Sequence, residues 1–112
     1  MLDILAWHER GTRFGIRMDD DGLLLAGDAG TQLTWMDARI GGRPVTPRHG
    51  KPVEIQALWY NALRSVVALA VEYRVANTAR ILSRTPARAR RHFARLFWND
   101  DAGCLYDVVR GG

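Results

Sequence analysis

The longest apolar pattern in the chain runs from Pro52 to about Arg80 and predicts a helix. Nearly every position up to Val71 is apolar. Four polar positions form one narrow stripe at helical spacing: Glu54, Asn61, Ser65 and Glu72. Proline suits the first helical turn, because its missing N–H would have no partner there. A helix that is apolar around most of its circumference must be enclosed, so we expect further helices to cover this one.

A second amphipathic pattern predicts a helix from Ala87 to Trp98, preceded by Thr85 as a capping residue and by Pro86 in the first turn. One face is apolar. The opposite face carries arginines: Arg88, Arg91 and Arg95. Beyond the turn residues that follow, the stretch 105–109 is expected to be extended.

Upstream, a β-hairpin is predicted near residues 14–26. Phe14–Met18 alternates apolar and polar residues, the turn Asp19–Gly22 follows, and Leu23–Ala26 is apolar. A calcium loop is the alternative for the acidic turn, but Gly30 stands where the closing Glu of such a loop belongs. Met1–Glu9 indicates either the end of a helix or a short extended segment.

Between hairpin and long helix lies a loop rich in Gly and Pro, Thr34–Lys51. A structureless connection of this length is uncommon in a compact domain and is usually functional or disordered. Its apolar residues argue against disorder. Asp37 sits beside Trp35 and Met36, and cations follow: Arg39, Arg43, Arg48 and Lys51.

These stretches resemble a known family. The run T-W-M-D-A at 34–38, a short basic loop, and G-K-P-V-E-I-x-A-L-W-Y-N-A-L at 50–63 are similar to the amylo-α-1,6-glucosidase domain of glycogen-debranching enzymes. The likeness is dense over Leu23–Leu63 and looser in FGIRMDDDGLLLAG and FWNDDAGCLYDVV. It implies a mainly α fold. We therefore expect residues 1–112 to form a partial catalytic domain, a fragment of an (α/α)6 barrel with the short hairpin near residues 14–26.

The resemblance also implies a reaction: inverting hydrolysis of α-1,6-linked glucose at branch stubs of glycogen or another α-glucan. It makes Asp37 the general acid and puts the general base in a later barrel segment, so we expect this chain alone to be inactive. A carboxyl keeps its proton in dry, apolar surroundings, which Trp35 and Met36 can supply. Spacing alone would favour Asp37 as a turn cap or a partner of Arg39; the resemblance reverses that preference.

Four further residues are predicted to bind the sugar. Trp35 can stack on a pyranose or belong to the core, and the two alternatives stay open. Arg48 and Lys51 can donate to glucose hydroxyls, against the alternative of solvated loop charges. Glu54 is carried over as a substrate contact, although the helix dipole alone explains an acid in the first turn. For Asp107 a role in holding the loop is favoured over lining the pocket.

Composition adds limits. The apolar and charged fractions, 47% and 25%, are ordinary for a globular protein, and the formal net charge is +4. The lone Cys104 suggests a reducing compartment, so we expect a cytoplasmic protein. The sequence has no apolar run of about 18 residues and no secretory pattern at its start, so no membrane contact is expected. His49 lacks further ligands at metal-binding spacing, and we expect neither metal nor cofactor.

Two alternatives remain. Another (α/α)6 glycosidase, trehalase-like or glucoamylase-like, would share the fold. From a different class, a non-catalytic helical module could use its arginine face to bind a protein or nucleic acid. Nucleic acid is disfavoured because aromatic and arginine residues fall on different faces of the predicted helix, whereas stacking and phosphate contacts need them to converge.

Overall fold

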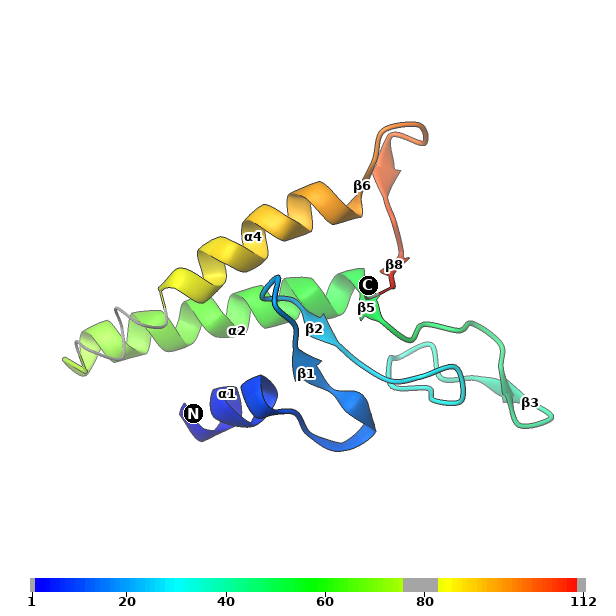
Figure 1. Cartoon of the computed structure of the whole chain (residues 1–112), viewed down its shortest axis with the longest axis horizontal. Helices are drawn as coiled ribbons and strands as arrows, with labels where there is room; N and C mark the ends of the chain where they lie inside the picture. Colours follow the sequence, from blue (N-terminus) through cyan, green and yellow to red (C-terminus); the bar gives the residue numbers. More distant parts are fainter. Residues whose placement is uncertain (1, 76–82, 111–112) are drawn as a thin grey trace.

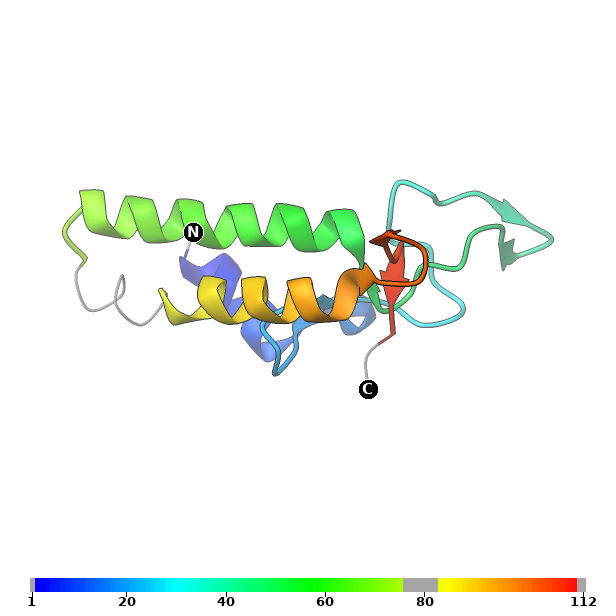
Figure 2. The same ribbon diagram turned by 90° about the horizontal axis from the view of Figure 1, so that it is seen from above.

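The computed structural model describes residues 2–75 and 83–110, and this part of the chain is mainly helical, as predicted (Figure 1). Its helices are α1 (Leu2–Arg10), α2 (Val53–Glu72) and α4 (Arg84–Phe97), with a 3-10 turn, η1, at Arg13–Gly15. α2 and α4 run in opposite directions and lie side by side (Figure 2). Membership of a six-hairpin barrel stays a prediction.

The strands are short and pair in antiparallel twos. β1 (Arg17–Met18) pairs with β2 (Leu24–Leu25), and β3 (Arg39–Ile40) with β4 (Arg43–Pro44). β5 (Lys51–Pro52) pairs with β8 (Val108–Val109), and β6 (Trp98–Asn99) with β7 (Cys104–Leu105). The β1–β2 pair confirms the predicted hairpin. Of the stretch 105–109, Leu105 and Val108–Val109 lie in strands as predicted, whereas Tyr106 and the bend at Asp107 do not.

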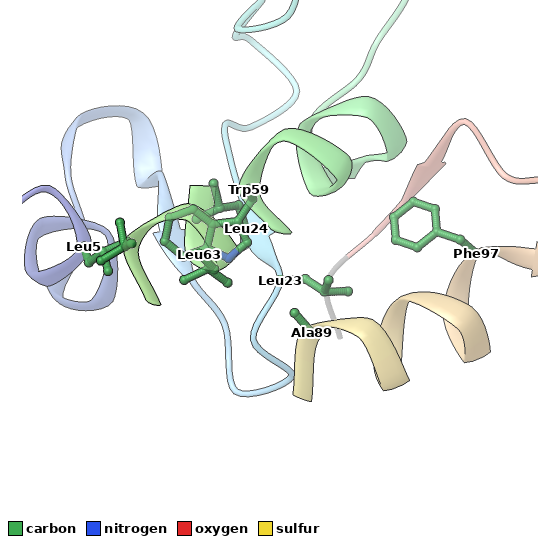
Figure 3. Packing of buried hydrophobic residues seen from close by; sticks show 8 residues of the cluster. Leu5, Leu23, Leu24, Trp59, Leu63, Ala89 and Phe97 are labelled. Carbon is green, nitrogen blue, oxygen red and sulfur yellow. The ribbon is translucent and has the colours of Figure 1, made fainter. Parts of the chain in front are cut away.

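One stripe of α2 forms the centre of the core. Its buried positions are spaced three and four residues apart: Gln56, Trp59, Leu63, Val66 and Ala70. Leu23 and Leu24 of the hairpin lie against this stripe, Ala89 of α4 lies beside Leu23 (Figure 3), and Phe97 of α4 belongs to the same buried cluster. The core is therefore a seam where the hairpin meets both long helices.

Polar contacts fix the hairpin to α2. The Gln56 side chain is 1% exposed. Its Oε1 accepts from the Leu24 N–H at 2.8 Å, and its Nε2 donates to the Leu24 carbonyl, also at 2.8 Å. The Trp59 indole N–H donates to the Gly22 carbonyl at 2.9 Å. The Gln56 amide thus makes the two hydrogen bonds to the Leu24 backbone that a neighbouring strand would make.

The long helix is shorter than the sequence predicts. α2 ends at Glu72, and residues 73–75 are not helical. The Arg74 backbone is left-handed, with a φ of 56°; its N–H donates to Val71, and the next N–H donates to Ala70. This is the hydrogen-bond pattern of a Schellman helix end, where glycine is the usual left-handed residue. The predicted helical residues 76–80 lie outside the described part.

Three further boundaries differ from expectation. Phe14 is in η1 with a φ of 59° rather than in a strand, so β1 is confined to Arg17–Met18. α4 begins at Arg84, before the expected Thr85 cap, with Pro86 still in the first turn. The loop Thr34–Lys51 is not structureless, because β3 and β4 form a hairpin inside it.

The expected enclosure of α2 is absent from the described residues. Leu58 and Val71 of α2 and the following Tyr73 are exposed. Within 2–75 and 83–110, no helix is both long and apolar enough to cross a membrane.

Candidate active site

The candidate catalytic residue lies on a loop that closes on itself. We use the name Asp37 loop for residues 27–49. At its base, Ala26 and Gly50 form a backbone pair with N–H to carbonyl distances of 2.8 and 2.9 Å. The loop therefore leaves and rejoins the body of the protein at one point, and β3 and β4 lie in the part that extends from the body (Figure 1).

The loop is held internally by hydrogen bonds to main-chain carbonyls. Arg39 donates to the carbonyls of Gly30 at 3.1 Å and of Gly42 at 2.6 Å. The Ala38 carbonyl accepts from the Gln32 amide at 3.1 Å and from the Val45 N–H at 3.0 Å. Residues on both sides of Asp37 in the sequence make these bonds. The backbone at Asp37 is therefore held in place although the loop lies at the surface.

The predicted general acid is exposed. Asp37 lies at the surface, Met36 is half-buried, and Trp35 is 72% exposed. Trp35 is thus not a core residue in the described part of the chain, and its ring is open to a ligand. The dry environment that a proton-carrying carboxyl needs is not formed by these neighbours.

Arg48 is buried beneath the loop between two carboxylates. Its residue is 5% exposed. Its Nη1 and Nη2 donate to both Glu54 oxygens at 2.5 and 2.6 Å, and its Nε and Nη2 donate to both Asp107 oxygens at 2.9 and 2.8 Å. The hydrogen bonds from Arg48 hold the pKa of Glu54 below its ordinary value of 4.5, although partial burial opposes this. The same bonds, led by that to Glu54, raise the pKa of Arg48.

Lys51 forms a second buried ionic group. Its Nζ lies 2.7 Å from an Asp19 oxygen and 2.5 Å from an Asp21 oxygen, and the residue is 4% exposed. Burial alone would lower the Lys51 pKa, but the hydrogen bonds to Asp19 and Asp21 outweigh it and the pKa is raised. The Lys51 hydrogen bond lowers the pKa of Asp19. The acidic turn is a lysine-binding turn, closed by a bond from the Gly22 N–H to the Asp19 carbonyl.

The predicted site residues fall into two groups. Trp35 and Asp37 are exposed on the loop, whereas Arg48, Lys51 and Glu54 belong to the ionic groups at its base. In residues 2–75 and 83–110, no hydrogen bond or ion pair joins Asp37 to Glu54. The predicted sugar contacts of Arg48 and Lys51 stay predictions, and their N–H groups already serve carboxylates.

Two partners of these cations escaped sequence reasoning as site residues. The sequence predicts a turn, or alternatively a calcium loop, at Asp19 and Asp21, and no local signal connects Asp21 to a lysine 30 residues further on. Asp107 holds the base of the loop through Arg48, which agrees with the role favoured for it.

Two surface pockets lie near the candidate site, and neither is formed by the exposed loop residues Trp35 and Asp37. A polar hollow of about 460 Å³ is lined by the acidic turn, Lys51, and His92 and Arg95 of α4. An apolar hollow of about 450 Å³ lies between α2 and α4 around Leu23 and Phe93. Neither has Trp35 or Asp37 in its lining. Within the described residues, no group of three or more His, Cys, Asp or Glu side chains is arranged to hold a metal ion.

Comparison with family models places nearly the whole chain in a class of glycoside hydrolases. Residues 1–111 match the model described as amylo-alpha-1,6-glucosidase. The chain therefore belongs to the amylo-α-1,6-glucosidase family, and its resemblance to the glucosidase domain of glycogen-debranching enzymes is confirmed. A comparison with curated proteins finds no match.

Proposed function

We propose that this chain is part of a catalytic domain that hydrolyses α-1,6-linked glucose at the branch stubs of an α-glucan. Family membership over residues 1–111 is the observation that carries the proposal. The exposed Trp35 ring, next but one to Asp37, supports it, because an apolar ring face suits the C–H face of a glucose unit.

In the proposed reaction, Asp37 protonates the leaving glycosidic oxygen while a water attacks the anomeric carbon from the opposite face. An inverting pair of carboxyls stands roughly 6.5–9.5 Å apart, which leaves room for that water. Glu54 is held ionised by Arg48 and so suits a charged contact to the sugar rather than proton donation. The general base would come from a segment outside this chain.

The surface of the chain supports a larger catalytic domain. Large apolar side chains are exposed along the loop and α2, among them Trp35, Ile40, Leu58 and Val71. A helix that is apolar around most of its circumference requires other elements to cover it. We infer that the remainder of the domain covers these side chains and dries the surroundings of Asp37.

The test uses the complete domain and a branched dextrin as substrate. Asp37→Asn should lower turnover by roughly 10²–10⁴-fold, the range typical of general acid catalysis, and leave glucan affinity largely unchanged. Asp100→Asn, an exposed carboxylate in the β6–β7 turn, serves as the matched control. Wild-type turnover in the Asp37 variant would remove it as the acid.

Two further measurements define the substrate and the role of the segment. Release of glucose from branched dextrin, but not from trehalose or maltose, distinguishes this function from a trehalase-like or glucoamylase-like one. The purified 112-residue chain should release no glucose. Detectable release would show that the general base lies within these residues.

A further inference from the structure

The base of the Asp37 loop is a junction of segments that are distant in the sequence. Gly50 pairs with Ala26 and has a φ of 111°. A Cβ built on Gly50 would lie 2.8 Å from the Val109 carbonyl oxygen, so the β8 backbone lies directly against the loop base. The backbones at the start of the loop, at its end and in β8 are therefore packed directly against one another.

Two buried cations flank this junction, and their acidic partners all come from outside the loop. Arg48 connects the loop to α2 through Glu54 and to the segment before β8 through Asp107. Lys51 connects the junction to the β1–β2 turn. A guanidinium with two bidentate carboxylate partners has its plane fixed, because the fork geometry of each pair allows one orientation.

We propose that Arg48 is a positioning residue of the Asp37 loop: its two carboxylate pairs set the direction in which the loop leaves the body. This inference rests on the proposed function, in which Asp37 is the acid. Reacting groups must be placed closely, and a displacement of about 1 Å costs on the order of 10²-fold in rate. Arg48 controls that placement through the loop without touching the substrate.

The contacts of Arg48 argue against a direct role in sugar binding. Three of its nitrogens already donate to four carboxylate oxygens. A sugar hydroxyl would have to displace Glu54 or Asp107, and removing one partner of a buried ion pair leaves a charge without compensation. Positioning and sugar binding predict different kinetic effects, which makes the proposal testable.

Hydrogen exchange on the 112-residue chain tests the position of the loop without requiring activity. Arg48→Met should raise exchange at the Gly50 N–H, which donates to Ala26 at the base of the loop, by about tenfold or more, while amides in the middle of α2 keep their protection. The matched control is Arg43→Met, an exposed arginine in the same loop. Unchanged exchange at the Gly50 N–H, or an equal rise in α2, would overturn the proposal.

A milder variant covers the case in which Arg48→Met does not fold. Asp107→Asn keeps the guanidinium and its Glu54 pair, and weakens only the connection to the segment before β8. It should raise exchange at the same amide by a smaller factor. If it leaves that exchange unchanged, the Asp107 pair does not position the loop and the proposal fails.

Kinetics of the complete domain give the second arm. Arg48→Met should lower kcat on branched dextrin by roughly 10–100-fold with KM within about twofold. A raised KM with unchanged kcat would assign Arg48 to sugar binding and overturn the positioning role. An inactive wild-type domain would overturn the proposed function instead, while hydrogen exchange still decides whether Arg48 positions the loop.

Discussion

Replacing Gln56 by Met tests the main polar connection between the hairpin and α2. The methionine side chain has a similar length and volume, but its thioether neither donates nor accepts a strong hydrogen bond. In the variant, the N–H and the carbonyl of Leu24 both lose their side-chain partner. The site is 1% exposed, so water does not reach it without a structural change.

The expected cost follows from those two groups. A buried backbone donor or acceptor left without a partner costs roughly 1–3 kcal/mol. Two such groups on Leu24 give a loss of about 2–6 kcal/mol in the free energy of unfolding. Since a domain of this size has about 5–15 kcal/mol in total, the variant should lose a large share of its stability.

Urea unfolding followed by tryptophan fluorescence measures this loss, because the buried Trp59 ring lies on the same face of α2 as Gln56. Asn61→Met, on the exposed side of α2, is the control and should shift stability by less than about 0.5 kcal/mol. If Gln56→Met unfolds at the same urea concentration as the control with an equal slope, the amide does not hold the hairpin and the reasoning is wrong.

Two further predictions concern the loop base and pH. Gly50→Ala should lower the free energy of unfolding by roughly 2–5 kcal/mol, through backbone strain and the clash with β8. The control Gly41→Ala, at a left-handed position in open space, should lower it by only about 1–2 kcal/mol. Equal urea midpoints for the two variants would contradict the close approach of β8 to Gly50. Glu54 and Asp19 have pKa values below their ordinary 4.5 and 3.8, so their stabilisation is full above about pH 5 and is lost as the pH falls through the lowered values. When the pH is lowered beneath about 5, the urea concentration at the unfolding midpoint should therefore decrease in the wild type and decrease less steeply in Arg48→Met.

The elements of the fold were predictable wherever a local pattern carries them. The apolar period of α2 and the acidic turn between two apolar runs each specify their own element. The end of α2 was missed because Arg74, not glycine, takes the left-handed position of the helix end. The β3–β4 hairpin had a usable signal in Gly41-Gly42, both with positive φ, since paired glycines favour a two-residue hairpin turn.

The candidate site was predictable only in part. Local sequence grouped Arg48, Lys51 and Glu54 near the loop, but the partners that define their state lie far along the chain. Asp107 is 59 residues from Arg48, and Asp21 is 30 residues from Lys51. Such pairs form when strands and helices come together, and spacing within a motif does not contain that information. The exposure of Trp35 and Asp37 likewise depends on what packs over the loop.

The distribution of charge limits which carboxyl can donate a proton. Glu54 and Asp19 are bonded to buried cations that favour their ionised forms, so each is a poor general acid near neutral pH. Asp37 has no cation bonded to it among the described residues, and apolar side chains stand next to it in the sequence. A surface that packs over Trp35 would therefore bring apolar side chains towards Asp37 without first having to break an ion pair. In the proposed reaction, the loop base would hold Asp37 in place, and a part of the domain packed over the loop would supply the apolar surroundings in which Asp37 acts.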